Sequence, residues 1–464
     1  MEKTLYLKNI GKLSEAEIKL EGITVICGEN NTGKSTVGKA LFNIYNVFDD
    51  CEKFVNSQRK KYISKEITKL NNDLDLILQP ESSSFGILSN DEIQEKYTDM
   101  LKQCSKNDVE KILDAYIEER KRSYGISSPL LNQEERKFLN WKNRAIKTFS
   151  DIMNITDKEI IEDCVTLKTE KVFHSQATKI STSESVIELK DEVKGILKTK
   201  FLSGDKCKDI DREYTVTESD IPVYIDSPRI IDFLSAPLLK ADDFFRQFLS
   251  PSLNSSELYT QLKSENYVFS LLEQASNSGY DNFSRMDIIK TEKKISKMIN
   301  ELNALLNGSF ETSNNSIKFK DKNIPEPLDV RNLSTGVKSM AVIERCLSLG
   351  LIKEGSTLIL DEPEIHLHPE WQLKYAEYVV ILQKALDLTV LITTHSPQFL
   401  RAIEVYTDKY EIMDRLNVYS IEDDKIKNAS YSEYGISEIY EKQFAAPSPC
   451  CSFAVSVIQN SILT

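Results

Sequence analysis

The 464-residue sequence has no hydrophobic run that approaches the length of a membrane span. A helix needs about 18 consecutive apolar residues before it is a candidate to cross a bilayer. The opening stretch MEKTLYLKNIGKLSEAEIKL also lacks the charged and then apolar layout of a secretory signal. From these two absences we expect a cytoplasmic protein that has no membrane partner.

Cysteine and histidine are scarce, and their placement excludes the common zinc and disulfide frameworks. The eight cysteines are scattered without a C-x-x-C pair, which suits a reducing compartment. The adjacent Cys450 and Cys451 have no nearby histidine, so we expect a packed or mobile terminus there and not a metal or redox site. Three of the four histidines, His366, His368 and His395, fall within 30 residues of one another. That region is therefore the first in which to look for chemistry.

Positive charge is in deficit, because the formal net charge of the chain is −13. Extensive phosphate-binding surfaces need many clustered lysines and arginines, so a protein coated with such surface is excluded. One stretch, Tyr116 to Ser150, holds eight basic and four acidic residues with aromatic residues between them. A solvated helical face is the favoured interpretation of this stretch, and a local nucleic-acid contact is the alternative.

The order of sequence patterns predicts an α/β protein with a central mixed sheet, an antiparallel β section and a large inserted helical lobe. Strand-like TLYLKNI, EAEIKL and ITVIC open the chain, and apolar STLIL and LTVLIT return near the other end. We predict these segments: sheet domain 1–48, helical lobe 49–163, β section 164–229, second helical insertion 230–315, second part of the sheet domain 316–445, and a terminal tail 446–464.

The stretch GENNTGKST, which follows the apolar run ITVIC directly, has the pattern of a phosphate-binding loop. Such a loop turns backbone N–H groups around a phosphate, while Lys34 reaches the β- and γ-phosphates and the Ser35 hydroxyl binds Mg²⁺. The strand before it and the helix after it are the context in which the pattern is specific. The predicted nucleotide-binding residues are Gly28, Asn30, Asn31, Thr32, Gly33, Lys34, Ser35 and Thr36.

The stretch LILDEP supplies the acids that hydrolysis of a bound nucleotide requires. A buried strand delivers Asp361 and Glu362 to its carboxyl end, the edge at which open α/β sheets gather ligands. We predict that Asp361 holds Mg²⁺ through water and that Glu362 is the general base. An ordinary acidic turn would be the favoured interpretation if this dipeptide stood alone.

Two further segments carry polar groups that fit the same chemistry. LTVLITTHSP ends a second apolar strand at His395, which is predicted to contact the γ-phosphate and to help position the attacking water. NLSTGVKS opens an apparent helix, so Ser334 and Gly336 are predicted to lie at an anion-binding helix start, where they serve the nucleotide of another copy. The alternatives are an ordinary polar residue at a strand end for His395 and a simple helix cap for Ser334.

The order of these four motifs resembles that of the ATP-binding-cassette class of ATPases, in the soluble branch that includes RecF, SMC proteins and OLD-type ATPases. In this resemblance the Walker A motif is 28–36, the signature 333–338, the Walker B motif 358–362 and the switch histidine His395. EIHLHPEWQ is similar to the D-loop region of the OLD-like ATPases. The resemblance implies an ABC-type head that binds ATP and Mg²⁺ between two copies, as a homodimer or a higher homo-oligomer.

The same resemblance extends to the stand-alone ATPase components of antiphage systems of the Septu and PARIS types. It implies a regulator of a separately encoded effector, a nuclease, since no metal-nuclease cluster follows TTHSP. A RecF-like repair ATPase that clamps DNA is the alternative, and an assembly scaffold that hardly turns over is a third. A transporter would require a membrane partner. Asp226, Ser227 and Pro228 are interpreted as the end of a strand and the start of a helix, outside the active site.

Overall fold

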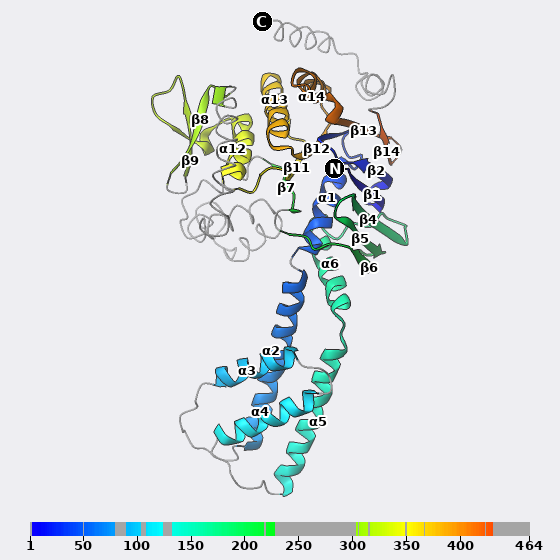
Figure 1. Cartoon of the computed structure of the whole chain (residues 1–464), viewed down its shortest axis with the longest axis vertical. Coiled ribbons are helices and arrows are strands. Elements are labelled where there is room, and N and C mark those ends of the chain that lie inside the picture. The colour runs from blue at the N-terminus through cyan, green and yellow to red at the C-terminus, as the bar shows by residue number, and fades with distance from the viewer. Residues whose placement is uncertain are drawn as a thin grey trace, which may run out of the picture. The chain divides into compact units, whose positions relative to one another are not determined.

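Figure 1 shows the computed structural model of the chain, which describes residues 2–49, 51–78, 90–103, 108–123, 132–217, 220–227, 303–304, 306–313, 316–348, 350–365, 367–422 and 424–429. Most of the predicted second helical insertion lies outside the described residues, as do the terminal tail, His366, Cys450 and Cys451. The chain divides into two compact units, one of Met1–Asp49 with Thr166–Thr464 and the other of Asp50–Val165. The domain boundaries given by the sequence stay predictions.

The larger unit is built on an eleven-stranded mixed sheet, counted over the described residues, in the order β6-β5-β4-β1-β2-β14-β13-β3-β12-β11-β7. The strands are β1 (Lys3–Ile10), β2 (Leu13–Lys19), β3 (Ile23–Cys27), β4 (Glu184–Asp191), β5 (Gly195–Leu202), β6 (Cys207–Arg212), β7 (Val223–Ile225), β11 (Thr357–Asp361), β12 (Thr389–Thr394), β13 (Leu416–Glu422) and β14 (Lys425–Asn428). The predicted α/β class with a central mixed sheet is confirmed.

One half of this sheet is parallel and forms the centre of the unit. Strands β13, β3, β12, β11 and β7 run parallel to one another. All five residues of β3, ITVIC, are buried, as expected of a strand covered on both faces. Helix α1 (Lys34–Phe48) contacts β11 and β12, and α13 (Pro369–Leu386) packs against α14 (Pro397–Lys409). The carboxyl ends of these parallel strands therefore meet at one edge.

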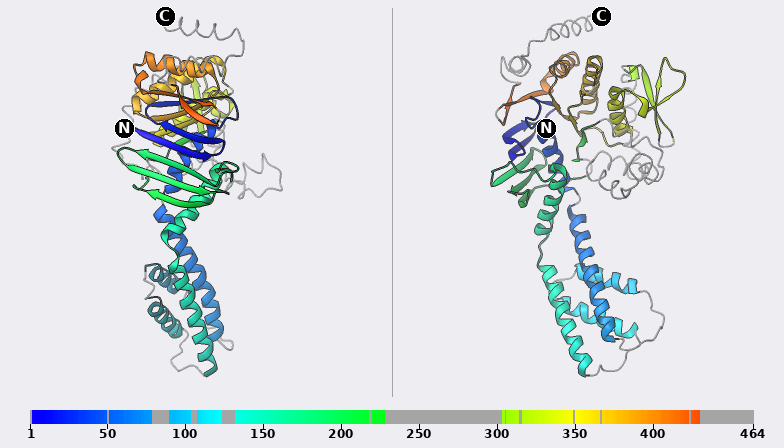
Figure 2. Two further views of the ribbon diagram at one scale, coloured as in Figure 1. Left: turned by 90° about the vertical axis from the view of Figure 1, so that its right-hand side faces the viewer. Right: turned by 180° about the vertical axis from the view of Figure 1, so that it is seen from behind.

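The other half of the sheet is an antiparallel meander. Strands β1, β2, β4, β5 and β6 pair antiparallel, and Figure 2 shows the blue β1 and β2 beside the green β4 to β6. In β2, LSEAEIK, buried apolar positions alternate with exposed ones, because one face packs inward and the other meets solvent. This half brings the turn between β1 and β2 against the loop that follows β3, since Lys12 donates to the carbonyl of Asn31 at 2.8 Å.

Three details of the predicted β section are wrong. Helix α6 (Asp157–Phe173) continues past the predicted start of that section, and REYTVT is not a strand. Strand β7 is not antiparallel but runs parallel to β11 at the end of the strand order, and its apolar residues Val223 and Ile225 are buried. The end of the predicted second helical insertion instead forms β8 (Gly308–Ser313), which pairs with β9 (Ser316–Asp321) in a small antiparallel sheet that also contains β10 (Leu328–Asp329).

The smaller unit is helical and has its own hydrophobic core. It contains α2 (Cys51–Leu78), α3 (Asn90–Gln103), α4 (Val109–Ser123), α5 (Asn132–Asn154) and the start of α6. Trp141 and Phe149 of the basic stretch are buried in this core with Tyr116, so they are packing residues and not a platform for bases. No helix in the part of the chain that the structure describes is both long and apolar enough to cross a bilayer.

Candidate active site

The glycine loop lies between β3 and α1, as predicted. Gly33 has a φ of +105°, and a Cβ atom there would lie 3.3 Å from the side chain of Leu13, so both backbone angle and space favour glycine. Thr32 Oγ1 donates to the carbonyl of Glu29 at 2.8 Å and closes the turn. The predicted nucleotide-binding residues in this segment, Gly28, Asn30, Asn31, Thr32, Gly33, Lys34, Ser35 and Thr36, lie in the loop and the first turn of α1.

Lys34 joins this loop to the acidic strand. Its side chain is almost completely buried, and its ammonium donates to the carbonyl of Glu29 at 2.7 Å. The same ammonium lies 3.2 Å from Oε1 of Glu362. The structure therefore brings together two predicted catalytic residues that are far apart in the sequence.

Asp361, at the end of β11, is held by hydrogen bonds to both carboxylate oxygens. Thr393 Oγ1 donates to Oδ1, and the hydroxyl of Tyr224 donates to Oδ2 at 3.0 Å. Tyr224 lies on β7, which pairs with β11, and burial raises its pKa well above the ordinary value, as does the charge of Asp361. The phenol therefore stays protonated and remains a donor to the carboxylate.

Glu362 has an uncommon backbone conformation, with a φ of +47°. A positive φ in a residue other than glycine costs on the order of 1 kcal/mol or more, so it needs local support. Thr393 gives that support, because its carbonyl and its Oγ1 both accept from the N–H of Glu362 at 3.0 Å. The sharp turn after β11 sets the Glu362 carboxylate beside Lys34.

His395 follows β12 and completes the group. Its Nδ1 lies 3.7 Å from Oε2 of Glu362 and 3.5 Å from Oε1 of Glu364. Because β12 lies between β3 and β11, the residues that follow these three strands share one edge. Lys34, Glu362 and His395 are thus neighbours, as the predicted strand order requires, while their catalytic roles stay predictions.

Ser334 and Gly336 lie at the start of α12 (Thr335–Ser348). Ser334 is exposed, whereas Gly336 is buried beneath the indole of Trp371, to which a Cβ atom would approach within 3.1 Å. The fold of the single chain thus already favours glycine at 336. His368, another histidine singled out in the sequence, accepts from the N–H of Glu370 and caps α13.

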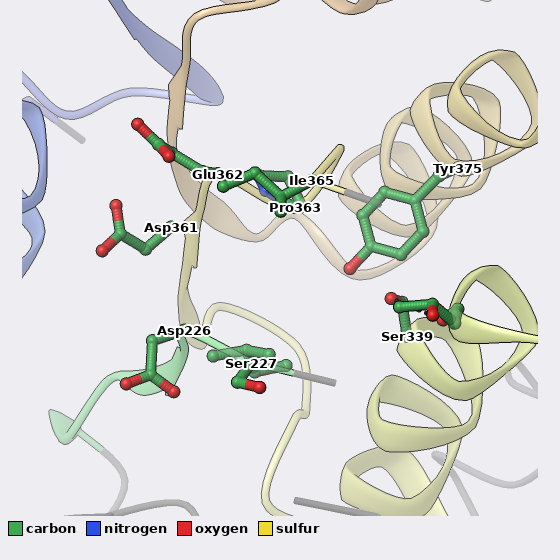
Figure 3. Close-up of a pocket in the computed structure, with 10 residues that line it drawn as sticks. Asp226, Ser227, Ser339, Asp361, Glu362, Pro363, Ile365 and Tyr375 are labelled. Atoms are coloured by element: carbon green, nitrogen blue, oxygen red, sulfur yellow. Dashed lines mark hydrogen bonds between the residues drawn. The ribbon is translucent and has the colours of Figure 1, made fainter. Parts of the chain in front are cut away.

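Asp226 and Ser227, which the sequence analysis places outside the active site, follow β7 and lie on the same cleft as Asp361 and Glu362. Together with Ile225, Thr335, Ser339, Asp361, Glu362, Pro363, Ile365 and Tyr375, they line a cleft of about 370 Å³. Figure 3 shows Asp226 beside the end of the strand that carries Asp361. The sequence carries a pattern that indicates this placement, because IPVYIDS and LILDEP are both apolar runs that end in an acid. Glu364 and Tyr224 also escaped the sequence analysis.

Comparison with known proteins gives one family and several distant structures. The sequence matches the family model described as AAA ATPase domain over residues 1–400. The SMC head domain from Thermotoga maritima is 12% identical with a TM-score of 0.36, over 92% of this chain and 97% of that chain. An SMC head bound to the C-terminal winged-helix domain of ScpA is 11% identical with a TM-score of 0.38, over 93% of this chain and 98% of that chain. Among curated proteins no significant match is found.

A third structure, the SMC head with an extended coiled coil bound to the C-terminal domain of ScpA from Pyrococcus furiosus, is 12% identical with a TM-score of 0.34, over 95% of this chain and 98% of that chain. All three TM-scores are below 0.5, so the assignment depends on the family match alone. That match includes the glycine loop, the strand that ends at Asp361 and the histidine that follows β12. The chain belongs to the AAA ATPase domain family.

Proposed function

We propose that the chain is an ABC-class ATPase that binds ATP with Mg²⁺, hydrolyses it to ADP and phosphate, and regulates a separately encoded effector. The observation that carries the proposal of hydrolysis is the meeting of Lys34, Glu362 and His395 at the carboxyl edge of three neighbouring parallel strands. A phosphate loop alone would support binding only. A carboxylate beside the loop lysine and a histidine beside that carboxylate also support turnover.

The residues around Asp361 fit Mg²⁺. This ion takes oxygen ligands, keeps several waters, and binds through one or two protein groups together with substrate phosphates. The Ser35 hydroxyl and the Asp361 carboxylate are such groups, and the described residues contain no cluster of three or more His, Cys, Asp or Glu that would suggest a different metal. When bound, Mg²⁺ would neutralise charge on the β- and γ-phosphates.

Glu362 is proposed as the general base. Its ion pair with Lys34 controls whether its carboxylate can bind the attacking water. The Lys34 ammonium lies 3.2 Å from Oε1 of the Glu362 carboxylate. Phosphate oxygens compete for the same ammonium, because charge-assisted hydrogen bonds to phosphate are among the strongest that lysine makes. Once Lys34 binds the phosphates, the Glu362 carboxylate is left to orient a water and to accept its proton.

Replacing Tyr224 with phenylalanine is expected to raise the Mg²⁺ concentration needed for half-maximal ATPase activity roughly 10-fold, since loss of a residue that orients a metal ligand typically weakens metal affinity by 10- to 100-fold. The phenol is the group that fixes Oδ2 of Asp361. The measurement is ATPase rate against Mg²⁺ concentration. Tyr97→Phe is the matched control, because it removes a phenol bond to the carboxylate of Glu119 in the helical unit. Equal Mg²⁺ dependence in both variants would contradict the role of Tyr224.

A dimer around ATP is proposed because Ser334 is exposed at the start of α12, which is a second helix start besides that of α1 after the phosphate loop. A chain that has its own phosphate loop needs no second anion-binding helix start in the same site. The first turn of α12 instead offers N–H groups to the nucleotide of another copy.

A regulatory role is proposed because the helical unit Asp50–Val165 has its own core and holds none of the residues assigned to ATP chemistry. Four large apolar side chains of this unit are exposed: Tyr62, Met100, Leu139 and Ile155. Single exposed side chains of this kind are normal on protein surfaces, so the proposal depends on the separate core of this unit. We propose that this unit recognises the trigger or the effector, a nuclease, in an antiphage system.

Purification of the Glu362→Gln protein with Mg²⁺ and ATP, from a host that retains the neighbouring genes, tests this role. A defined protein that co-purifies with this variant, and is lost when Lys34→Ala is added, would support an ATP-controlled effector. A bare dimer that captures duplex DNA only with ATP would replace the regulatory role by a RecF-like one. The mass of the complex and the nucleic acid content of the sample distinguish the two results.

A further inference from the structure

Glu364 is a buried carboxylate to which the proposed mechanism gives no task. It lies two residues after Glu362 and is 3% exposed. Its Oε1 accepts from Thr394 Oγ1 at 2.6 Å and from the backbone N–H of His395 at 3.1 Å. Burial raises the pKa of Glu364, and these hydrogen bonds oppose the rise. A glutamate is seldom so completely buried, and those two bonds use only one of its oxygens.

Two buried polar atoms that lack hydrogen-bond partners lie in the same place. His395 Nδ1 is buried and makes no hydrogen bond within the described residues, and the same holds for Oε2 of Glu364. The His395 Nδ1 atom lies 3.5 Å from Oε1 of Glu364 and 3.7 Å from Oε2 of Glu362. A small rotation of either side chain would bring the ring nitrogen of His395 into hydrogen-bonding distance of the Glu364 carboxylate.

We propose that Glu364 is a positioning residue for His395. An ionised carboxylate can only accept, so a bond to it places the proton of the ring on Nδ1. The partner of one ring nitrogen fixes the orientation of the imidazole and leaves Nε2 as the nitrogen presented to a ligand. This inference deepens the proposed function and rests on it, since the orientation of His395 matters for turnover only if nucleotide binds beside Glu362.

The arrangement also keeps His395 from occupying the proposed base. The ring lies between two carboxylates, and a bond from Nδ1 to Glu362 would compete with the water that Glu362 has to activate. Glu364 is the nearer of the two, and its Oε1 is fixed by Thr394. Glu364 therefore fixes the imidazole of His395, while the Glu362 carboxylate changes its partner from the Lys34 ammonium to the attacking water.

The protonation state of His395 tests the inference without any nucleotide. The chain has only four histidines, so ¹⁵N-histidine labelling gives a simple spectrum, in which His395→Gln identifies the signal. We expect Nδ1 to carry a proton in the full-length protein, and this signal to shift in Glu364→Gln. The control Glu377→Gln alters another buried carboxylate, which Lys409 and Tyr410 bind, and should leave the signal unchanged. An unprotonated Nδ1, or a signal that Glu364→Gln does not move, would overturn the inference.

Steady-state hydrolysis of Mg–ATP tests the consequence. Glutamine at 364 can still accept from Thr394 and from the N–H of His395, so the turn is kept while the charge is lost. We expect kcat to fall roughly 10-fold, with KM for ATP within about twofold, and no further loss when Glu364→Gln is added to His395→Gln. Losses that multiply in the double variant would show that Glu364 does not act through His395. If His395→Gln alone hydrolyses ATP at the normal rate, the proposed role of His395 fails, and the ¹⁵N result still decides whether Glu364 holds the ring.

Discussion

Replacement of Glu362 by glutamine is expected to lower the rate of ATP hydrolysis at least about 100-fold while ATP stays bound, because general base catalysis typically contributes between 10²- and 10⁴-fold. The change removes the group that accepts the proton of water and leaves the phosphate loop intact. The backbone of Glu362 keeps both hydrogen bonds to Thr393, so the turn after β11 is not expected to change. Turnover by phosphate release and ATP affinity by equilibrium binding separate the two effects.

The same variant is expected to accumulate as a dimer in Mg–ATP. In the proposed dimer, hydrolysis releases the nucleotide held between the two copies, so a variant that binds ATP without cleaving it is expected to stay closed. Light scattering with ATP and with ADP measures the mass of each state. Glu370→Gln is the matched control, because Glu370 is an exposed acid on α13 that pairs with Lys374. If Glu362→Gln hydrolysed ATP at the normal rate, the assignment of the base would be wrong.

The central parts of this site could be predicted because they are local sequence patterns with unambiguous geometry. The glycine loop begins directly after a run of five buried residues, and Asp361 directly follows another such run, 356–360. Parallel strands of this kind carry their polar groups at one edge, so the order of the motifs was sufficient to bring Lys34, Glu362 and His395 together. The helical unit inserted between Lys34 and Glu362 does not change which strands are neighbours in the sheet.

The residues that support this group could not be predicted, because their roles depend on contacts between distant segments. Tyr224 reaches Asp361 only because β7 pairs in parallel with β11, and a three-residue strand does not reveal its direction. The sequence around Glu364 is typical of an exposed acid in a polar turn, and only the fold shows that Glu364 is buried against the end of β12. The sequences of β8, GSFETS, and β9, SIKFKD, are too polar to be recognised as strands directly after a helical pattern.

Replacing Lys34 with alanine is expected to weaken ATP binding roughly 100-fold, and hydrolysis is expected to fall with it. A hydrogen bond from a charged donor contributes about 1.5–3 kcal/mol, and each 1.4 kcal/mol is a factor of ten in affinity. Lys34 is buried at 3% exposure, so its ammonium is little screened by water and its full contribution is lost. Titration calorimetry of the purified protein with Mg–ATP measures the affinity directly.

The Lys12→Ala variant is the control for Lys34→Ala. Comparing their ATP affinities shows whether Lys34 binds the phosphates or only supports the loop. The Lys12 ammonium donates to the carbonyl of Asn31, in the same loop, but the side chain is exposed and has no place among the residues assigned to phosphate. Lys12→Ala is expected to weaken ATP binding less than about 10-fold, since an exposed contact is worth roughly 1 kcal/mol or less. Equal losses in the two variants would show that Lys34 acts by holding the loop. A larger loss of ATP affinity in Lys34→Ala than in Lys12→Ala would show that the Lys34 ammonium binds the phosphates. Both lysines contact the same loop, but only Lys34 is buried. Lys34→Ala also removes the cation beside Glu362.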